Sequence, residues 1–281
     1  MFPGAVADRA EAEYAVIGAP LDVSTTFQPG TRFGPDRIRQ FSRSFEDYDH
    51  RTGLRFSECA VYDDGDLHAW NDAAEYVAYL GGLCSDFHSE GAVPILLGGE
   101  HTVTAAGVRG VDPDVLVVLD AHLDLRTEYD GDPWNHACAT RRALETVDEA
   151  VILGARAGSE EEWLRAESDD VTVVLPDEVS EWLTDGPTGL EGRSVYLSVD
   201  IDAADPSVAP GTGTMEPFGL SARECREIVR AVAPCADGFD VVEVNDRDDG
   251  QAATLAGKLL RTFVRERTAE RADRHSGDSR S

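Results

Sequence analysis

The sequence predicts an α/β protein with three layers, in which helices cover both faces of a mainly parallel central sheet. Short apolar runs alternate with amphipathic segments from one end of the chain to the other, which is typical of strands buried between helices. The chain has 281 residues, of which 42% are hydrophobic and 7% aromatic, so it can bury one substantial core. We therefore expect one domain.

The apolar runs predict seven strands, and the amphipathic segments between them predict helices. The last helical segment carries Leu255, Leu259, Leu260 and Phe263 close to helical spacing. The predicted strands are Tyr14 to Gly18, Ala92 to Leu97, Val115 to Asp120, Ala150 to Gly154, Val171 to Leu175, Val195 to Asp200 and Phe239 to Val244. The predicted helices include Asn71 to Ser89, Ala137 to Thr146, Glu160 to Glu167, Ser221 to Ala233 and Gln251 to Glu266.

The domain is expected to span residues 1–267. No internal repeat and no Gly/Ser-rich linker divides this stretch. From Thr268 the sequence loses its apolar residues, so residues 268–281 are predicted to be a disordered polar tail in which His275 is solvated.

The charge balance excludes two classes of partner. The chain has 54 acidic and 25 basic residues, a net charge of -29, so neither nucleic acid nor an anionic membrane is expected to bind. Lys258 is the only lysine, and an acidic, lysine-poor surface suits a salt-rich cytoplasm. We therefore hypothesise a halophilic protein, the alternative being an acidic protein of an ordinary cytoplasm.

The cysteines and the N-terminus indicate a soluble, cytoplasmic protein. The N-terminal sequence lacks the basic segment followed by an apolar segment that is typical of a secretory signal peptide. No apolar run is long enough to span a bilayer. The cysteines are odd in number and lack C-x-x-C spacing, so we expect reduced thiols with neither disulfides nor a thiolate zinc site. They are Cys59, Cys84, Cys138, Cys225 and Cys235.

Three predicted strands end in side chains that commonly bind metals. Ligands of parallel sheets bind beyond the carboxyl ends of the strands, where loops from several strands converge. The three strands run into the sequences Gly-Gly-Glu-His at 98–101, Asp-Ala-His-Leu-Asp at 120–124 and Asp-Ile-Asp at 200–202. Together these segments offer four aspartates and two histidines to one edge of the sheet.

The spacing of these residues predicts a divalent metal site. Residues two apart in an extended segment point the same way, so Asp120, His122 and Asp124 can face one cavity, as can Asp200 and Asp202. Four carboxylates without opposing cations would repel one another strongly. A set of aspartates and histidines without thiolates suits a hard ion such as Mn²⁺.

The same motifs resemble those of the ureohydrolase family, which includes arginases and agmatinases. GGEHTVT, DAHLD and SVDIDAADPSVAPGTGT resemble its three metal-binding signatures, and GAPLDVSTTFQPGTRFGPDRIRQFS resembles its N-terminal segment. The matches follow the family order and extend from Tyr14 to Phe263. The resemblance is closest to agmatinases, and it implies an arginase-like fold and a homotrimer or homohexamer.

The resemblance also implies two manganese ions per chain. One ion would be held by His101, Asp120, Asp124 and Asp200, and the other by His122, Asp120, Asp200 and Asp202. Asp120 and Asp200 would bridge the two ions. Such a pair can lower the pKa of a shared water, which then attacks the guanidinium carbon of a small substrate.

Two further residues match family positions that take part in catalysis. His136 aligns with a histidine proposed to protonate the leaving amine, a role that suits an imidazole. Glu243 aligns with a glutamate that contacts the guanidinium, and its carboxylate can accept two N–H bonds. The resemblance therefore implies that His136 and Glu243 bind substrate and act in catalysis, together with Asp124.

The implied reaction is hydrolysis of agmatine to putrescine and urea, which belongs to polyamine biosynthesis. The loop from Arg126 to Asn135 lacks the serine and asparagine run with which arginases hold the amino acid end of arginine. Arginine and 4-guanidinobutyrate remain alternative substrates. Asp246 replaces a proline that is usual in the family, which leaves the conformation of its loop open.

Two other classes of function remain as alternatives. A deacetylase of the same broad fold would need one zinc and would leave His101 and Asp124 without a role. An inactive acidic subunit is disfavoured because all the metal positions are filled.

Several other polar or aromatic residues have plainer interpretations. Asp63, Asp64 and Asp66 are expected in a turn and not in a third metal site. Trp134 either lines the substrate entrance or packs its loop, and Arg156 is expected to be structural or to contact another subunit. The Gly98-Gly99 pair is not a phosphate loop, because no G-K-[ST] follows.

Overall fold

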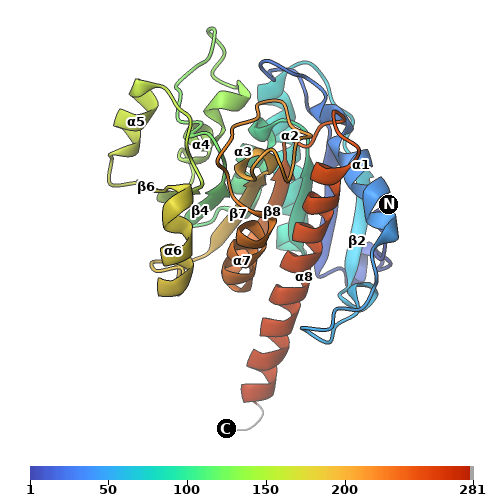
Figure 1. Ribbon diagram of the computed structural model, residues 1–281. Coiled ribbons are helices and arrows are strands. Elements are labelled where there is room, and N and C mark those ends of the chain that lie inside the picture. Colours follow the sequence, from blue (N-terminus) through green and yellow to red (C-terminus); the bar gives the residue numbers. More distant parts are fainter. Residues whose placement is uncertain (279–281) are drawn as a thin grey trace.

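The central sheet has eight strands in the order β2-β1-β3-β8-β7-β4-β5-β6, and every neighbouring pair is parallel. The computed structural model describes the backbone of residues 1–278 and the side chains of residues 1–272 (Figure 1). The strands are β1 (Tyr14–Ala19), β2 (Val61–Asp66), β3 (Val93–Gly98), β4 (Val115–Leu119), β5 (Glu149–Leu153), β6 (Val171–Val174), β7 (Val195–Asp200) and β8 (Ala236–Val242).

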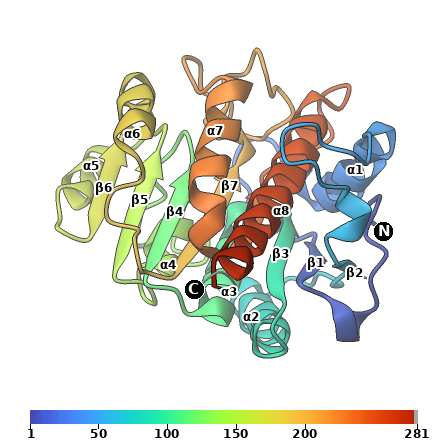
Figure 2. The same cartoon turned by 90° about the horizontal axis from the view of Figure 1, so that it is seen from below.

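Helices cover both faces of the sheet, which confirms the predicted three-layer architecture (Figure 2). One face carries α1 (Gly34–Phe41), α6 (Val179–Asp185), α7 (Ala222–Val232) and α8 (Gln251–Asp278). The other carries α2 (Ala73–Ser89), α3 (Thr104–Val111), α4 (Ala139–Ala143) and α5 (Glu160–Ala166). Short 3-10 turns follow three of the strands or loops that carry site residues: His101–Val103, His136–Cys138 and Ile201–Ala203.

The core is divided between the two faces because side chains alternate along each strand. In β3, Ile95 and Leu97 pack in the core beneath α7 and α8, whereas Leu96 packs with α2 and α3 on the opposite face. All six residues of β3 are buried. Because both faces of the strands are buried, their sequences are continuous apolar runs and do not alternate between apolar and polar residues.

The acidic segment at Asp63 forms strand β2, so the predicted turn there is wrong. The pairing of β2 with β1 skips Asp64, which is the extra residue of a bulge. Arg39 of α1 donates two hydrogen bonds of 2.8 Å to the Asp63 carboxylate and also pairs with Asp66. The carboxylates therefore fix helix α1 to the edge of the sheet, and a buried ion pair explains acidic residues in a strand.

The last helix is longer than the sequence predicted. Helix α8 continues to Asp278, through most of the region expected to be a disordered tail. Residues 267–272 are rich in alanine, glutamate and arginine, which favour helix. The hydroxyl of Thr268 also lies 2.9 Å from that of Tyr14, which fixes this part of the helix to β1. The final three residues of the predicted tail lie outside the described residues.

The strand order places the metal-type motifs side by side. The four central strands are β3, β8, β7 and β4, and their carboxyl ends lead to His101, Glu243, Asp200 and Asp120 respectively. The chain passes from β3 to β4 across two intervening strands, which creates the kind of crevice where α/β proteins bind ligands. Within residues 1–278, no helix has the length and apolar character needed to cross a membrane.

Candidate metal centre

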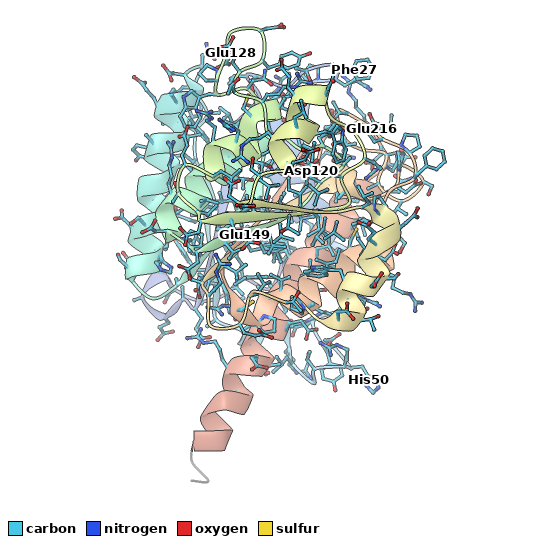
Figure 3. The ribbon with its side chains drawn as sticks, turned by 90° about the vertical axis from the view of Figure 1, so that its left-hand side faces the viewer. Phe27, His50, Asp120, Glu128, Glu149 and Glu216 are labelled. Carbon is cyan, nitrogen blue, oxygen red and sulfur yellow. The ribbon has the colours of Figure 1, made fainter. Side chains whose placement is uncertain are left out.

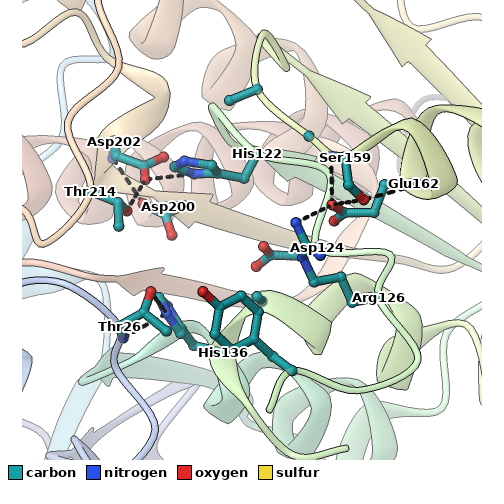
Figure 4. A pocket seen from close by; sticks show the side chains of 14 residues that line it. Thr26, His122, Asp124, Arg126, His136, Ser159, Glu162, Asp200, Asp202 and Thr214 are labelled. Atoms are coloured by element: carbon teal, nitrogen blue, oxygen red, sulfur yellow. Dashed lines mark hydrogen bonds and ion pairs between the residues drawn. The ribbon is translucent and has the colours of Figure 1, made fainter.

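The six predicted metal-type side chains lie together at the carboxyl edge of the sheet. In Figure 3, Asp120 lies inward from Phe27, Glu128 and Glu216, which are on the outer surface above this edge, and His50 is at the opposite end. Figure 4 shows Asp124, Asp200, Asp202 and His122 around one pocket. They come from two separate segments at the ends of β4 and β7, and His101 reaches them from the turn after β3.

His101 faces a group of carboxylates with one ring nitrogen. Its Nδ1 lies 2.9 Å from Asp124 Oδ2 and 3.1 Å from Asp120 Oδ2. Asp200 Oδ2 is slightly farther, at 3.5 Å from the same nitrogen. His101, Asp120 and Asp124 are all buried, and their ligand atoms lie within 4.8 Å of one another. These three residues could hold one metal ion.

His122 forms a second group that shares Asp120 with the first. Its Nδ1 lies 3.0 Å from Asp202 Oδ2 and 3.5 Å from Asp120 Oδ1. Asp120, His122 and Asp202 also bring their ligand atoms within 4.8 Å, so they could hold a second ion. The two oxygens of Asp120 face different histidines, as a bridging carboxylate requires. Asp200 belongs to neither compact group, and its Oδ1 accepts the amide of Asp202 at 2.8 Å.

The electrostatics of these groups favour a bound cation. Burial and repulsion from Asp120 raise the pKa of Asp124 to about 6. Burial and repulsion from Asp202 and Asp120 also raise the pKa of Asp200 well above its ordinary value. Among the described residues, none donates a well-directed hydrogen bond to the buried Asp120 Oδ2, although His101 Nδ1 lies close to it. Divalent cations would stabilise the ionised carboxylates and coordinate this oxygen, so the residues fit a dinuclear centre of hard cations.

Two site residues have a backbone conformation that is unusual for any residue except glycine. The φ angle is +50° at Asp124 and +60° at Glu243. Residues in such conformations cost about 1–3 kcal/mol each and cluster at functional sites. At both positions the chain turns sharply at the carboxyl edge of the sheet, which directs the two carboxylates into the site. The sequence gives no sign of this strain.

Glu243 uses one carboxylate oxygen for the structure of the site and leaves the other free. Its Oε1 accepts the backbone amide of His101 at 2.9 Å and lies 3.1 Å from Nδ1 of His136. Its Oε2 is buried and has no hydrogen-bond partner among the described residues. A buried carboxylate oxygen of this kind needs a donor, such as an N–H group of a bound substrate.

His136 is held between Glu243 and the loop after β1. The backbone N–H of Thr26 donates to Nε2 of His136 at 3.0 Å, and the Thr26 hydroxyl lies 2.8 Å from the same nitrogen. An N–H group can only donate, so in the neutral ring Nε2 accepts and the single proton lies on Nδ1, next to Glu243. Burial opposes a charge on His136, but Glu243 and Asp124 outweigh it and raise its pKa to about 9. Nearby divalent ions would lower this pKa again.

Glu100 organises the loop that contacts His136, and sequence analysis assigned it no role. This fully buried carboxylate accepts the amides of Val23 and Ser24 at 2.7 and 2.8 Å, and the Ser24 hydroxyl at 2.8 Å. The same Ser24 hydroxyl accepts the amide of His136 at 2.8 Å. The only signal in the sequence is a charged residue between a pair of glycines and a metal-type histidine. Glu100 therefore acts on the site by positioning its walls.

The site opens into a pocket of about 270 Å³. Four of the metal-type residues and His136 line it together with Arg126, Tyr129 and Thr214. Arg126 lies 3.1 Å from Glu162, which also caps helix α5 through Ser159 (Figure 4). The loop after Asp124 thus presents an arginine and a tyrosine to the pocket, without the serine and asparagine run expected in an arginase.

Two residues with open interpretations, Trp134 and Arg156, have structural contacts. Trp134 is absent from the lining of this pocket; it packs on the core beside α2 and α3, with the guanidinium of Arg109 4.7 Å from its ring centroid. Arg156 donates to backbone carbonyls of five residues, including Asp202 and Ala203, as expected for a structural residue. Beyond Asp246, the carboxylate of Asp248 accepts two amides at the start of α8, each at 2.8 Å.

Comparisons with known proteins agree with this geometry. Residues 12–265 match the model of the arginase family. The chain is 34% identical over 259 residues to an agmatinase of Pyrococcus horikoshii, covering 90% of this chain and 91% of that protein. It is 36% identical over 257 residues to an N(1)-aminopropylagmatine ureohydrolase of Thermococcus kodakarensis, covering 89% of each.

A solved structure is similar over almost the whole chain. The agmatine ureohydrolase of Thermoplasma volcanium superposes with a TM-score of 0.90 at 33% identity, covering 97% of this chain and 95% of that one. Three observations support one family assignment: the parallel sheet, the two groups of candidate metal ligands and the sequence matches. The chain therefore belongs to the arginase family, as an agmatinase-like ureohydrolase.

Proposed function

We propose that the chain hydrolyses agmatine to putrescine and urea with two manganese ions. The observation that carries this proposal is the free, buried oxygen of Glu243 beside two groups of metal-type ligands. A guanidinium group has the N–H donors that this oxygen lacks. The proposed metal ligands are His101, Asp120, His122, Asp124, Asp200 and Asp202.

The metal ions and the protein would have separate tasks in this reaction. Divalent ions held by these residues would lower the pKa of water and so supply a nucleophile near neutral pH. Glu243 holds the guanidinium through Oε2 and orients its carbon towards the aspartates. The same carboxylate offsets the positive charge of the substrate in a site that is largely buried.

His136 is the proposed proton donor to the leaving amine. Its Nδ1 holds a proton next to Oε1 of Glu243, the residue proposed to bind the substrate. The contact with Thr26 fixes the orientation of the ring. A donor held this close to the bound guanidinium can protonate the leaving nitrogen without a large movement.

The choice of agmatine rests on the relatives and on the pocket loop. Proteins named agmatinase are among those similar over most of the chain. The loop that carries Arg126 and Tyr129 lacks the serine and asparagine run with which arginases hold the amino acid end of arginine, and its Arg126 is paired with Glu162. N(1)-aminopropylagmatine is a second candidate, because a ureohydrolase named for it is 36% identical.

A panel of guanidino compounds tests the proposal. The protein, loaded with MnCl₂, would be assayed for urea release from agmatine, N(1)-aminopropylagmatine, 4-guanidinobutyrate and arginine, at low and high KCl. We expect the highest kcat/KM with agmatine. A preference for arginine or 4-guanidinobutyrate would overturn the substrate assignment. One zinc per chain with deacetylation and no urea would overturn the reaction itself.

A further inference from the structure

Asp240 is a carboxylate buried in the middle of the sheet without a role in the proposed reaction. It lies in β8 among Phe239, Val241 and Val242, and it is fully buried. Burying a carboxylate is costly unless hydrogen bonds or charges compensate for it. No arginine or lysine forms an ion pair with Asp240 in the part of the chain that the structure describes. Its compensating partners must therefore be polar groups close by.

A chain of side chains connects Asp240 with His101. Ser198 lies opposite Asp240 on the neighbouring strand β7, and its hydroxyl donates to Asp240 Oδ1 at 2.6 Å. The same Ser198 oxygen lies 3.4 Å from Nε2 of His101. The hydroxyl of Thr104 lies 3.2 Å from Ser198 and adds a side contact to this chain. All four residues are buried.

The direction of these hydrogen bonds determines which nitrogen of His101 carries the proton. The Ser198 hydroxyl has one proton and gives it to Asp240, so towards His101 it can only accept. Nε2 of His101 must then be the N–H donor. Nδ1, which faces Asp124 and Asp120, keeps its lone pair and can bind a cation. Histidine ligands are commonly fixed in this way through the nitrogen that does not bind the metal.

We propose that Asp240, acting through Ser198, is a positioning residue that fixes the proton of His101 on Nε2 and so makes Nδ1 a metal ligand. The inference rests on the proposed function insofar as His101 holds one of two ions. It adds Ser198 and Asp240, which follow His101 by 97 and 139 residues in the sequence, to the residues that position the centre.

Metal binding by three variants tests this role. Metal-free wild-type protein and the variants Asp240→Asn, Ser198→Ala and Thr104→Val would be titrated with MnCl₂, and the free ion followed by electron paramagnetic resonance. We expect two bound ions in the wild type. In Asp240→Asn and Ser198→Ala, one ion should bind about 10–100-fold more weakly and the other nearly as before.

The remaining variant and a stability measurement separate positioning from a general structural role. Thr104→Val removes a buried hydroxyl from the same cluster but leaves the path from His101 to Asp240 intact, so we expect affinities close to those of the wild type. The Tm of metal-free Asp240→Asn should not fall, because a neutral amide is easier to bury than a carboxylate.

Each contrary result has a distinct meaning. Two ions bound with unchanged affinity in both Asp240→Asn and Ser198→Ala would overturn the inference and leave the proposed function standing. Equal weakening of both ions together with a lower metal-free Tm would show a structural role and overturn it as well. A wild-type protein that binds fewer than two ions would instead overturn the dinuclear centre, and this inference with it.

Discussion

In single residues at the site, one carboxylate oxygen holds the local structure and the other is placed for the proposed chemistry. Glu243 binds the backbone of His101 and the ring of His136 with Oε1, and its Oε2 remains free. Asp120 turns one oxygen to each metal-type histidine. The sequence motifs identified both carboxylates. The assignment of their individual oxygens depends on the positive φ of Glu243 and on contacts across the sheet, which a motif does not encode.

Replacing Glu243 by glutamine tests the division between its two oxygens. The amide oxygen can keep the contact with the His101 backbone, whereas the amide nitrogen cannot accept an N–H of the substrate. We expect Glu243→Gln to lower kcat/KM for agmatine at least about 100-fold, the loss typical of a key charged contact in a transition state. The number of bound Mn²⁺ ions should stay at the wild-type value.

The control for this variant is Glu128→Gln, an exposed carboxylate on the outer loop in Figure 3. It should keep the kcat/KM of the wild type. Retention of full activity by Glu243→Gln would show that the free oxygen does not bind the guanidinium. Loss of bound manganese would show instead that Glu243 acts through the metal centre.

Close packing between helices and strands positions the secondary-structure elements that carry the site. Helix α3 follows the metal-type histidine His101 and packs on β7, which carries Asp200. The contact is close because Gly107 of α3 faces the buried hydroxyl end of Tyr196. The sequence did not predict α3, since its residues are small and apolar and its turns are few. Its position is set by packing and not by its own periodicity.

A methyl group at Gly107 should disturb this contact. The added carbon would collide with the hydroxyl of Tyr196, so we expect Gly107→Ala to lower the free energy of unfolding by about 1–3 kcal/mol. Gly82 in α2 is the matched control, because a methyl group there meets no atom within 4 Å. Gly82→Ala should stabilise the protein by about 0.5–1 kcal/mol through helix propensity. Urea unfolding measures both, and equal effects would refute the packing argument.

The ion pair between α1 and β2 should make stability depend on pH. Burial would raise the pKa of Asp63, but its hydrogen bonds with Arg39 outweigh burial and lower it. A lowered folded-state pKa stabilises the fold above the unfolded value of about 3.9, and this contribution is lost as the pH falls through the folded value. We expect Asp63→Asn to cost about 3 kcal/mol at pH 7, because Arg39 loses a buried partner.

Unfolding by urea between pH 7 and pH 3 measures this contribution. The difference between the wild type and Asp63→Asn should shrink as the pH falls, because the wild-type carboxyl becomes protonated. Asp64→Asn, an exposed change in the same strand, should have little effect at any of these pH values. A difference that stays constant with pH would contradict the ion-pair explanation.

The molecule as a whole carries a net charge of -29, which sets its response to salt. Mutual repulsion between the acidic groups opposes folding, and salt shortens its range from about 10 Å at 0.1 M to about 3 Å at 1 M. The exposed ion pairs weaken over the same range, but the 54 acidic residues outnumber the 25 basic residues that could pair with them. Salt should therefore weaken the repulsion more than the attraction, and we expect the protein to be more stable in concentrated salt.

Thermal unfolding in KCl tests this whole-molecule prediction. We expect the Tm to rise steadily from low to molar KCl, with MnCl₂ held constant so that metal binding does not change the comparison. A Tm that is constant or falls would contradict the halophilic hypothesis. Sedimentation velocity in the same buffers would test the predicted trimer or hexamer, for which a monomer at all concentrations would be the contrary result.

The kinds of side chain at the site, and the elements with a strong local pattern, can be obtained from the amino-acid sequence alone. Buried parallel strands appear as continuous apolar runs, and the spacing of Asp120, His122 and Asp124 placed them on one face of an extended segment. These are local properties, fixed by the alternation of side chains along a strand. They were sufficient to predict the layers of the fold and the side chains that converge at the carboxyl edge of the sheet.

The residues that support the site from distant parts of the sequence are identified only in the folded chain. Glu100 lies 76 residues from Ser24, and Asp240 lies 42 residues from Ser198, yet each pair is joined by a hydrogen bond. These contacts exist because β1 lies beside β3, and β7 beside β8, in the sheet. The order of strands results from packing the whole core, so it cannot be obtained from the pattern of any one segment.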